Sequence, residues 1–244
     1  LVAFPTETVY GLGADALNEE AAQKIYAAKG RPSDNPLIVH IADMEALGRI
    51  AESIPKEAKA LAEAFWPGPL TMIFRKKECV PSGTTGGLST VAVRMPSDEI
   101  ARELIRQGGG YIAAPSANVS GRPSPTTAQH VYEDMKGRIP MILDGGPVRI
   151  GLESTIVDLT EEHPVILRPG YITLSMIRSI TGEAEVDRGL IADHSTVRPK
   201  APGMKYRHYA PKGELVIVEG EPQEVVRYIN EQTALHESDG KRTG

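Results

Sequence analysis

The feature that most constrains the fold is the alternation of short apolar runs with amphipathic segments along most of the chain. The runs have the length and composition of strands, and the segments carry apolar residues at helical spacing behind capping residues such as Asn18 and Asp98. We expect strands at 2–4, 37–41, 70–74, 90–95, 111–114, 141–144 and 154–159, and an extended stretch at 8–10. We expect helices at 18–30, 44–50, 55–65, 98–107, 126–136 and 172–180.

Strands interleaved with helices predict an α/β fold. Short connections between consecutive strands predict antiparallel neighbours, and therefore a mixed rather than a purely parallel sheet. The expected architecture is a twisted, mostly mixed open sheet with flanking helices.

The composition changes near residue 191. Residues 193–213 hold five cations and three prolines against one acidic residue, Asp193. Proline at this density disfavours both helices and central strands, so we predict a Pro-rich linker arm at 191–212. A strand at 214–219 and a helix at 222–232 then predict the first βα unit of a second domain that is incomplete. The predicted division is 1–190, 191–212 and 213–244.

Composition also excludes some classes of protein. At 41% hydrophobic and 24% charged residues, the 244-residue chain is ordinary globular material without an apolar run long enough to span a membrane. No export signal opens the chain, and the lone Cys79 excludes an internal disulfide or a cysteine-based metal cluster. We therefore expect a cytoplasmic protein. Its net charge of −5 argues against a protein whose main function is to bind nucleic acid through the phosphates.

Lys29 and Arg31 flank Gly30 where a predicted helix ends. In one interpretation, the two cations simply complement the helix dipole and face water. In another, Gly30 lets the backbone approach a ligand, so that both cations reach one phosphate chain. The chain contains no Walker A sequence, so any nucleotide is bound differently from that of a P-loop enzyme.

His40 and Arg94 each lie at or near the end of an apolar strand. A lone histidine at a strand end is usually structural. An arginine within an apolar strand is costly to bury unless an anion pairs with it. That anion is either a substrate carboxylate or a buried Asp or Glu, and the sequence leaves both open.

A loop of small polar residues follows the predicted strand 111–114. Its hydroxyl and amide side chains are Ser116, Asn118, Ser120 and Ser124. Alone such a loop is a turn, but after a buried strand it lies where open α/β sheets bind ligands. A similar loop at 151–155 and a further cation at a strand end, Arg168 within 167–170, are weaker signals.

The chain carries no Gly-x-Ser-x-Gly elbow, no His-Glu-x-x-His and no evident set of metal ligands. Covalent catalysis therefore has no obvious nucleophile. Positioning combined with electrostatics remains, and this suits reactions at phosphorus.

Taken together, the motifs resemble the YrdC-like family of threonylcarbamoyl-AMP synthases. The resemblance runs in order over about residues 1–185. It rests on Pro-Thr-Glu-Thr-Val-Tyr-Gly-Leu at 5–12 and on the runs at 29–40, 115–121, 153–155 and 167–170. The run at 202–211 is similar to the linker of the longer, two-domain members. In those members a small Rossmann-like domain follows the linker, so the resemblance implies that 213–244 is the incomplete start of such a domain.

The resemblance implies that L-threonine, bicarbonate (or CO2) and ATP give threonylcarbamoyl-adenylate and pyrophosphate. The product would serve the threonylcarbamoylation of adenosine 37 in tRNA, in functional coupling to the tRNA threonylcarbamoyl transferase. A Mg²⁺ ion would be held mainly through the ATP phosphates, with no metal site of the protein's own.

The resemblance also assigns site residues, with Lys29 and Arg31 as the catalytic pair. The implied ATP-binding residues are Lys29, Arg31, Asn35, Thr90, Ala114, Ser116, Ser124, Arg168, His208 and Tyr209. The implied threonine-binding residues are Thr8, His40, Arg94 and Ser154. His208 and Tyr209 would fold over the nucleotide as a lid that excludes water.

Two other functions are considered. One is a double-stranded RNA-binding module, which the net charge disfavours although direct RNA binding stays open. The other is a carbamoyl-adenylate-forming domain like that of hydrogenase-maturation proteins. That domain normally accompanies zinc fingers, for which a single cysteine leaves no room.

Overall fold

The computed structural model of the chain describes residues 1–187 and 215–243. The chain divides into two compact units, residues 1–210 and 211–244. The predicted linker at 191–212 lies outside the described residues.

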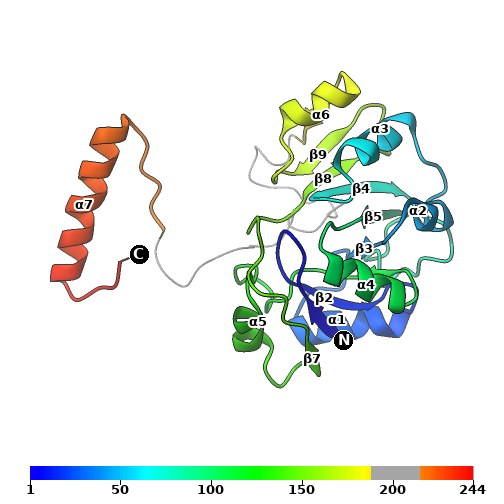
Figure 1. Cartoon of the computed structure of the whole chain (residues 1–244), viewed down its shortest axis with the longest axis horizontal. Coiled ribbons are helices and arrows are strands. Elements are labelled where there is room, and N and C mark those ends of the chain that lie inside the picture. The colour runs from blue at the N-terminus through cyan, green and yellow to red at the C-terminus, as the bar shows by residue number, and fades with distance from the viewer. Residues whose placement is uncertain (188–214, 244) are drawn as a thin grey trace. The chain divides into compact units, whose positions relative to one another are not determined.

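The first unit is built on one mixed sheet (Figure 1). Its strands are β1 (Val2–Phe4), β2 (Gly11–Asp15), β3 (Ile38–His40), β4 (Leu70–Arg75), β5 (Thr90–Arg94), β6 (Ile112–Ala113), β7 (Met141–Ile142), β8 (Thr155–Asp158), β9 (Val165–Arg168) and β10 (Glu185–Val186). They lie in the order β10-β9-β8-β4-β5-β3-β6-β2-β1-β7. Four neighbouring pairs are parallel and five antiparallel, which confirms the predicted mixed sheet.

Capping residues fix most of the helix ends. The helices of this unit are α1 (Glu19–Lys29), α2 (Met44–Ile50), α3 (Lys56–Phe65), α4 (Glu99–Gln107), α5 (Ala128–Met135) and α6 (Leu174–Thr181). Asn18 accepts hydrogen bonds from two backbone N–H groups of the first turn of α1. Gly30 ends that helix in the left-handed conformation, which glycine adopts without a steric penalty. Asp43 and Asp98 cap α2 and α4 in the same way as Asn18.

The two faces of the sheet are covered differently. Buried residues of α1, α2, α3, α5 and α6 share the main core with one face. On the other face, α4 packs against Phe4 and Ile112, while a further cluster that includes Ile38 and Ala92 consists of strand residues alone. Because side chains alternate along a strand, Val39 points into the main core and its neighbour His40 points to the second face.

Two expectations about strands were wrong, and further strands were missed. The extended stretch at 8–10 is a turn region, because Thr6 Oγ1 accepts hydrogen bonds from the N–H groups of Thr8 and Val9, and strand β2 begins only at Gly11. Strands β9 and β10 were not predicted. The strand expected at 214–219 is not formed by its described residues, 215–219, which have no partner strand among the described residues of the second unit.

In the second unit, α7 (Pro222–Ser238) runs six residues beyond the predicted end at 232. None of its residues is buried. The Rossmann-like character of this unit stays a prediction. Across the described residues of both units, no helix has the length and apolarity needed to cross a membrane.

Candidate active site

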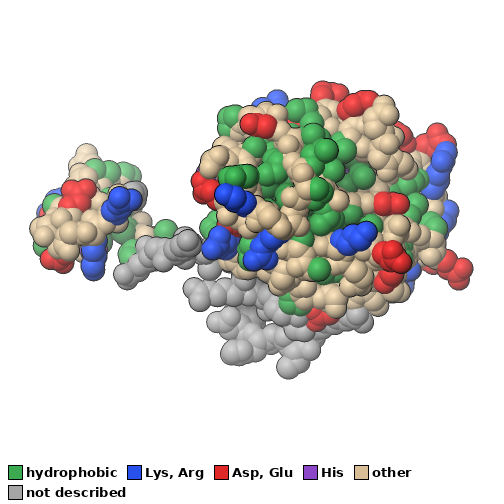
Figure 2. Space-filling view, turned by 90° about the horizontal axis from the view of Figure 1, so that it is seen from below, with side chains coloured by type: hydrophobic (Ala, Val, Ile, Leu, Met, Phe, Trp, Pro, Cys, Tyr) green, Lys and Arg blue, Asp and Glu red, His purple; other side chains and the backbone are tan. Residues whose placement is uncertain are grey.

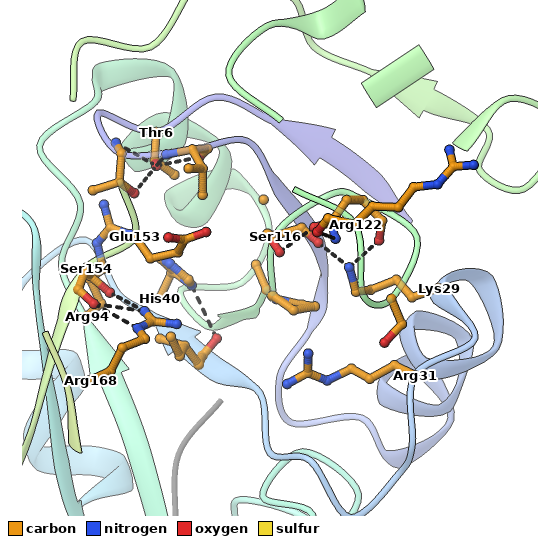
Figure 3. Close-up of a pocket in the computed structure, with 18 of the residues that line it drawn as sticks. Thr6, Lys29, Arg31, His40, Arg94, Ser116, Arg122, Glu153, Ser154 and Arg168 are labelled. Atoms are coloured by element: carbon orange, nitrogen blue, oxygen red, sulfur yellow. Dashed lines mark hydrogen bonds between the residues drawn. The ribbon is translucent and has the colours of Figure 1, made fainter. Parts of the chain in front are cut away.

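A cavity lies where segments distant in sequence meet on the second face of the sheet (Figure 3), and its space, together with the open solvent at its mouth, is about 700 Å³. Its walls come from the β1–β2 loop, the end of α1, strands β3 and β5, the loop after β6, the loop before β8 and the end of β9. Nine of the predicted site residues line it: Thr8, Lys29, Arg31, His40, Arg94, Ala114, Ser116, Ser154 and Arg168.

Three predicted residues do not line the cavity. Asn35 supports Arg31 from behind, since its Oδ1 accepts a hydrogen bond from Nη2 of Arg31 at 2.7 Å. Thr90 stands at the opposite end of β5 from Arg94. Ser124 touches the site indirectly, because its hydroxyl donates a hydrogen bond to Glu153, which does line the cavity. The predicted lid residues His208 and Tyr209 lie outside the described residues.

Lys29 is a buried cation at the end of α1. Its Nζ donates hydrogen bonds to the carbonyl oxygens of Ser116 and Asn118, so it ties the helix end to the loop after β6. Burial, followed by the charge of Arg31, holds the pKa of Lys29 well below its ordinary value. Because the side chain is only 1% exposed, the interpretation of Lys29 as a solvated cation at a helix end is wrong.

Arg31 is held from both sides by its own loop. Its Nε donates to the carbonyl of Asn35 at 3.1 Å, and its Nη2 donates to the carbonyl of Pro36 at 2.9 Å. A guanidinium held this firmly loses little further freedom when it binds an anion. Arg31 and Lys29 line the same part of the cavity (Figure 3).

Arg94 pairs with a buried carboxylate. Its Nη2 lies 2.7 Å from Oε1 of Glu7, and the two side chains are 5% and 2% exposed. The other oxygen of Glu7 accepts the N–H of Ser97 at 3.1 Å. Of the two anions that the sequence left open for Arg94, the structure contains the buried glutamate. Arg94 still lines the cavity and adds to its positive potential.

His40 is neutral in its folded environment. Burial, followed by the charge of Arg94, lowers the pKa of His40 to about 3. Its Nδ1 lies 3.2 Å from the carbonyl oxygen of Ile38, and since a carbonyl only accepts, Nδ1 carries the proton. The ring also meets Phe4 edge to face.

Ser154 lies directly before β8 and contacts side chains of β4 and β9. Its Oγ lies 2.7 Å from Oγ1 of Thr71 on β4, and Nη2 of Arg168 on β9 donates to it at 3.1 Å. Arg168 also donates from Nε and Nη2 to the Ser154 carbonyl, at 3.0 and 2.9 Å. These contacts hold Arg168 against the loop before β8.

Five polar lining residues have no role in the predicted ATP or threonine sites: Thr6, Asn118, Ser120, Arg122 and Glu153. Asn118 and Ser120 were predicted only as members of the polar loop after 111–114. Thr6 and Glu153 lie in motifs that carry the family resemblance, whereas Arg122 carried no signal. Among the described residues, no group of three or more His, Cys, Asp or Glu side chains is placed to hold a metal ion.

Comparison with known proteins assigns both parts of the chain. The Sua5/YciO/YrdC family, described as "Telomere recombination", matches residues 1–170. A second family, "Threonylcarbamoyl-AMP synthase, C-terminal domain", matches residues 172–244.

Individual relatives agree with these matches. The threonylcarbamoyl-AMP synthase of Pyrococcus abyssi is 56% identical over 244 residues, covering 100% of this chain and 72% of that protein. The threonylcarbamoyl-AMP synthase of Bacillus subtilis is 51% identical over 245 residues, covering 100% and 69%. The crystal structure of P. abyssi Sua5 complexed with L-threonine has a TM-score of 0.93 at 56% identity, covering 99% of this chain and 71% of that one.

The two consecutive family matches, the high identity over the whole chain and the shared fold show that this chain belongs to the Sua5/YciO/YrdC family, as its motifs predicted.

Proposed function

We propose that this chain is a threonylcarbamoyl-AMP synthase, which converts L-threonine, bicarbonate or CO2, and ATP into threonylcarbamoyl-adenylate and pyrophosphate. The observation that carries the proposal is a single pocket with two chemically different ends, in a chain 56% identical to a synthase of that name. One end has the cations Lys29 and Arg31 beside a loop of hydroxyls and amides. The other has His40, Ser154 and Arg168.

In this proposal the first end holds the nucleotide. Lys29 and Arg31 face the phosphate chain, and Ala114 and Ser116 lie beside the nucleoside. Arg168 contacts the nucleotide from the second end of the cavity. Asn35 acts through Arg31, while Thr90 and Ser124 serve the nucleotide site from outside the cavity. The roles of His208 and Tyr209 stay predictions.

The second end holds threonine, with Thr8, His40, Arg94 and Ser154 around it. The complex of P. abyssi Sua5 with L-threonine supports an amino-acid site in this fold. A neutral His40 is able to hydrogen-bond a polar substrate without adding charge.

The chemistry needs no nucleophile from the protein. The threonine amine is carboxylated, and an oxygen of the carbamate then attacks the α-phosphorus as pyrophosphate leaves. The protein places the reactants and stabilises the charge that develops on the phosphate oxygens.

The described residues do not fit a metal site of the protein's own. We therefore propose that Mg²⁺ enters with ATP as part of the substrate. The product passes to a tRNA threonylcarbamoyl transferase, and the enzyme works in the cytoplasm.

The test is pyrophosphate release from ATP. It should require both threonine and bicarbonate, and Lys29→Ala and Arg31→Ala should each abolish it. Incubation with labelled bicarbonate should give labelled threonylcarbamoyl-adenylate by mass spectrometry. Pyrophosphate release that proceeds equally without threonine would rule the proposal out.

A further inference from the structure

Glu153 is the acidic residue of a cavity whose other charged lining residues are basic. Five basic side chains line the cavity: Lys29, Arg31, Arg94, Arg122 and Arg168. A carboxylate among so many cations is expected to pair with one of them. Among the described residues, Glu153 forms no ion pair.

The neighbouring cations are engaged elsewhere. Arg94 pairs with Glu7, Arg122 pairs with Asp134, and Arg168 donates to Ser154. The recorded partner of the Glu153 side chain is the hydroxyl of Ser124, which donates to Oε1. The second oxygen, Oε2, has no hydrogen-bond partner among the described residues.

The backbone around Glu153 is held in place. Gly170 packs so closely that a Cβ there would lie 2.6 Å from the carbonyl oxygen of Glu153. The next residue, Ser154, is fixed by Thr71 and Arg168. Figure 3 shows Glu153 next to Ser154 and His40, on the side of the pocket away from Lys29 and Arg31. The carboxylate is therefore presented at the end of the pocket proposed for the amino acid.

An α-amino acid carries an anion and a cation on one carbon, so its site needs both charges close together. Arg94 offers the positive charge, and the remaining requirement is an anion near it. We infer that Glu153 binds the ammonium group of threonine and takes a proton from it. This inference rests on the proposed function and adds a catalytic residue to it.

The proton balance of the reaction gives this contact a chemical role. An ammonium nitrogen has no free electron pair, so one N–H proton passes to Oε2 of Glu153. The freed pair forms the N–C bond to the carbon of CO2, and a second proton leaves the new carbamic nitrogen for solvent. An oxygen of the resulting carbamate then attacks the α-phosphorus, and the bond to pyrophosphate breaks.

The experiment compares binding of L-threonine with binding of 2,3-dihydroxybutanoate, in which a hydroxyl replaces the ammonium. Isothermal titration calorimetry on the wild-type chain should show a preference for threonine of roughly tenfold or more. Glu153→Gln keeps the volume and a partner for Ser124, and it should abolish that preference while ATP affinity is unchanged. Glu153→Asp, which keeps the charge, should retain a preference.

Glu162→Gln is the matched control, because it removes an exposed carboxylate outside the cavity and should leave the preference intact. In rate measurements, the defect of Glu153→Gln in kcat/KM for threonine should shrink as pH rises through the pKa of the substrate amine. A wild-type chain that forms product, with an unchanged preference in Glu153→Gln, overturns this inference alone. A wild-type chain that neither binds threonine nor forms product overturns the proposed function as well.

Discussion

Arg94 shows how a residue that looks misplaced in the sequence becomes part of a site. In an apolar strand its charge has to be compensated, and Glu7 does so across 87 positions of the chain. Glu7 offsets the cost of burying this charge. The same arginine lines the cavity, so its guanidinium also lies at the proposed threonine site.

Replacing Glu7 should therefore destabilise the fold. Glu7→Gln leaves Arg94 buried without a counter-charge, and we expect a loss of about 3–5 kcal/mol in the free energy of unfolding, measured by urea denaturation. Glu45→Gln, which breaks the exposed pair with Arg49, is the matched control and should cause no measurable loss. A Glu7→Gln chain as stable as the wild type would contradict this account.

His40 predicts a pH dependence of stability. In the unfolded chain its pKa is near 6.5, and burial lowers it to about 3 in the folded chain. Below about 6.5 the unfolded state therefore binds more protons, so stability falls as pH falls from 6.5 towards 3, by at most about 1.4 kcal/mol per pH unit.

His40→Leu should remove this contribution. Urea denaturation at a series of pH values should show a shallower loss of stability for the variant than for the wild type between pH 6.5 and 3. Parallel curves for the two chains would show that His40 is not the titrating group.

Single residues were predictable where their chemistry conflicts with their surroundings. Lys29, Arg31 and Arg94 stood out because charge beside glycine or within an apolar strand needs a reason. Glu7 gave no such signal, since its partner Arg94 lies 87 positions away and is placed by the pairing of strands. Arg122 gave none either, because its partner Asp134 is placed by the packing of α5. The assignments of residues to ATP or to threonine came from the family resemblance rather than from the residues themselves.

At the scale of elements, helices were predicted well and short strands poorly. Asn18, Asp43 and Asp98 mark helix starts through contacts within four residues, so the sequence contains the evidence. Strands β9 and β10 exist because a neighbour pairs with them, and a strand of two residues such as β10 has no pattern of its own. For the same reason, an apolar run such as 215–219 does not become a strand without a partner.

Two glycines should respond to alanine in opposite ways. In β2, a Cβ on Gly13 would lie 2.8 Å from the ring of Phe4 and 2.9 Å from Ile112, both buried, so Gly13→Ala should destabilise by about 1–3 kcal/mol. In α2, a Cβ on Gly48 meets no atom within 4 Å, so Gly48→Ala should stabilise by about 0.5–1 kcal/mol. Thermal and urea denaturation of both variants measures the two changes in stability. If both substitutions change the free energy of unfolding in the same direction, the packing described for β2 is contradicted.

At the scale of the whole molecule, the net negative charge argues against a main role in binding RNA through its phosphates. Figure 2 shows one face, on which apolar areas lie among both basic and acidic side chains. Together with the net charge of −5 and the names of the relatives, this favours the synthase over the RNA-binding module.

The two units should differ in local stability. Helix α7 has no buried residue, whereas α2 and α3 each place three in the main core. Since a helix without tertiary packing is marginal in water, amides of α7 should exchange with solvent much faster than those of α3. Hydrogen exchange followed by mass spectrometry measures the difference. Comparable protection in the two helices would mean that α7 is covered.

The strand order also has a consequence for synthesis on the ribosome. Strand β2 pairs with β6, so Asp15 has no partner until Ile112 has been synthesised. Strand β1 likewise pairs with β7, which begins at Met141. At a translation rate of about 5–20 residues per second, the first hairpin is without these neighbours for roughly 5–25 s. During that time the unpaired edges of the hairpin are able to pair with other chains. Correct folding therefore depends on chaperones or on rapid pairing with β6 and β7.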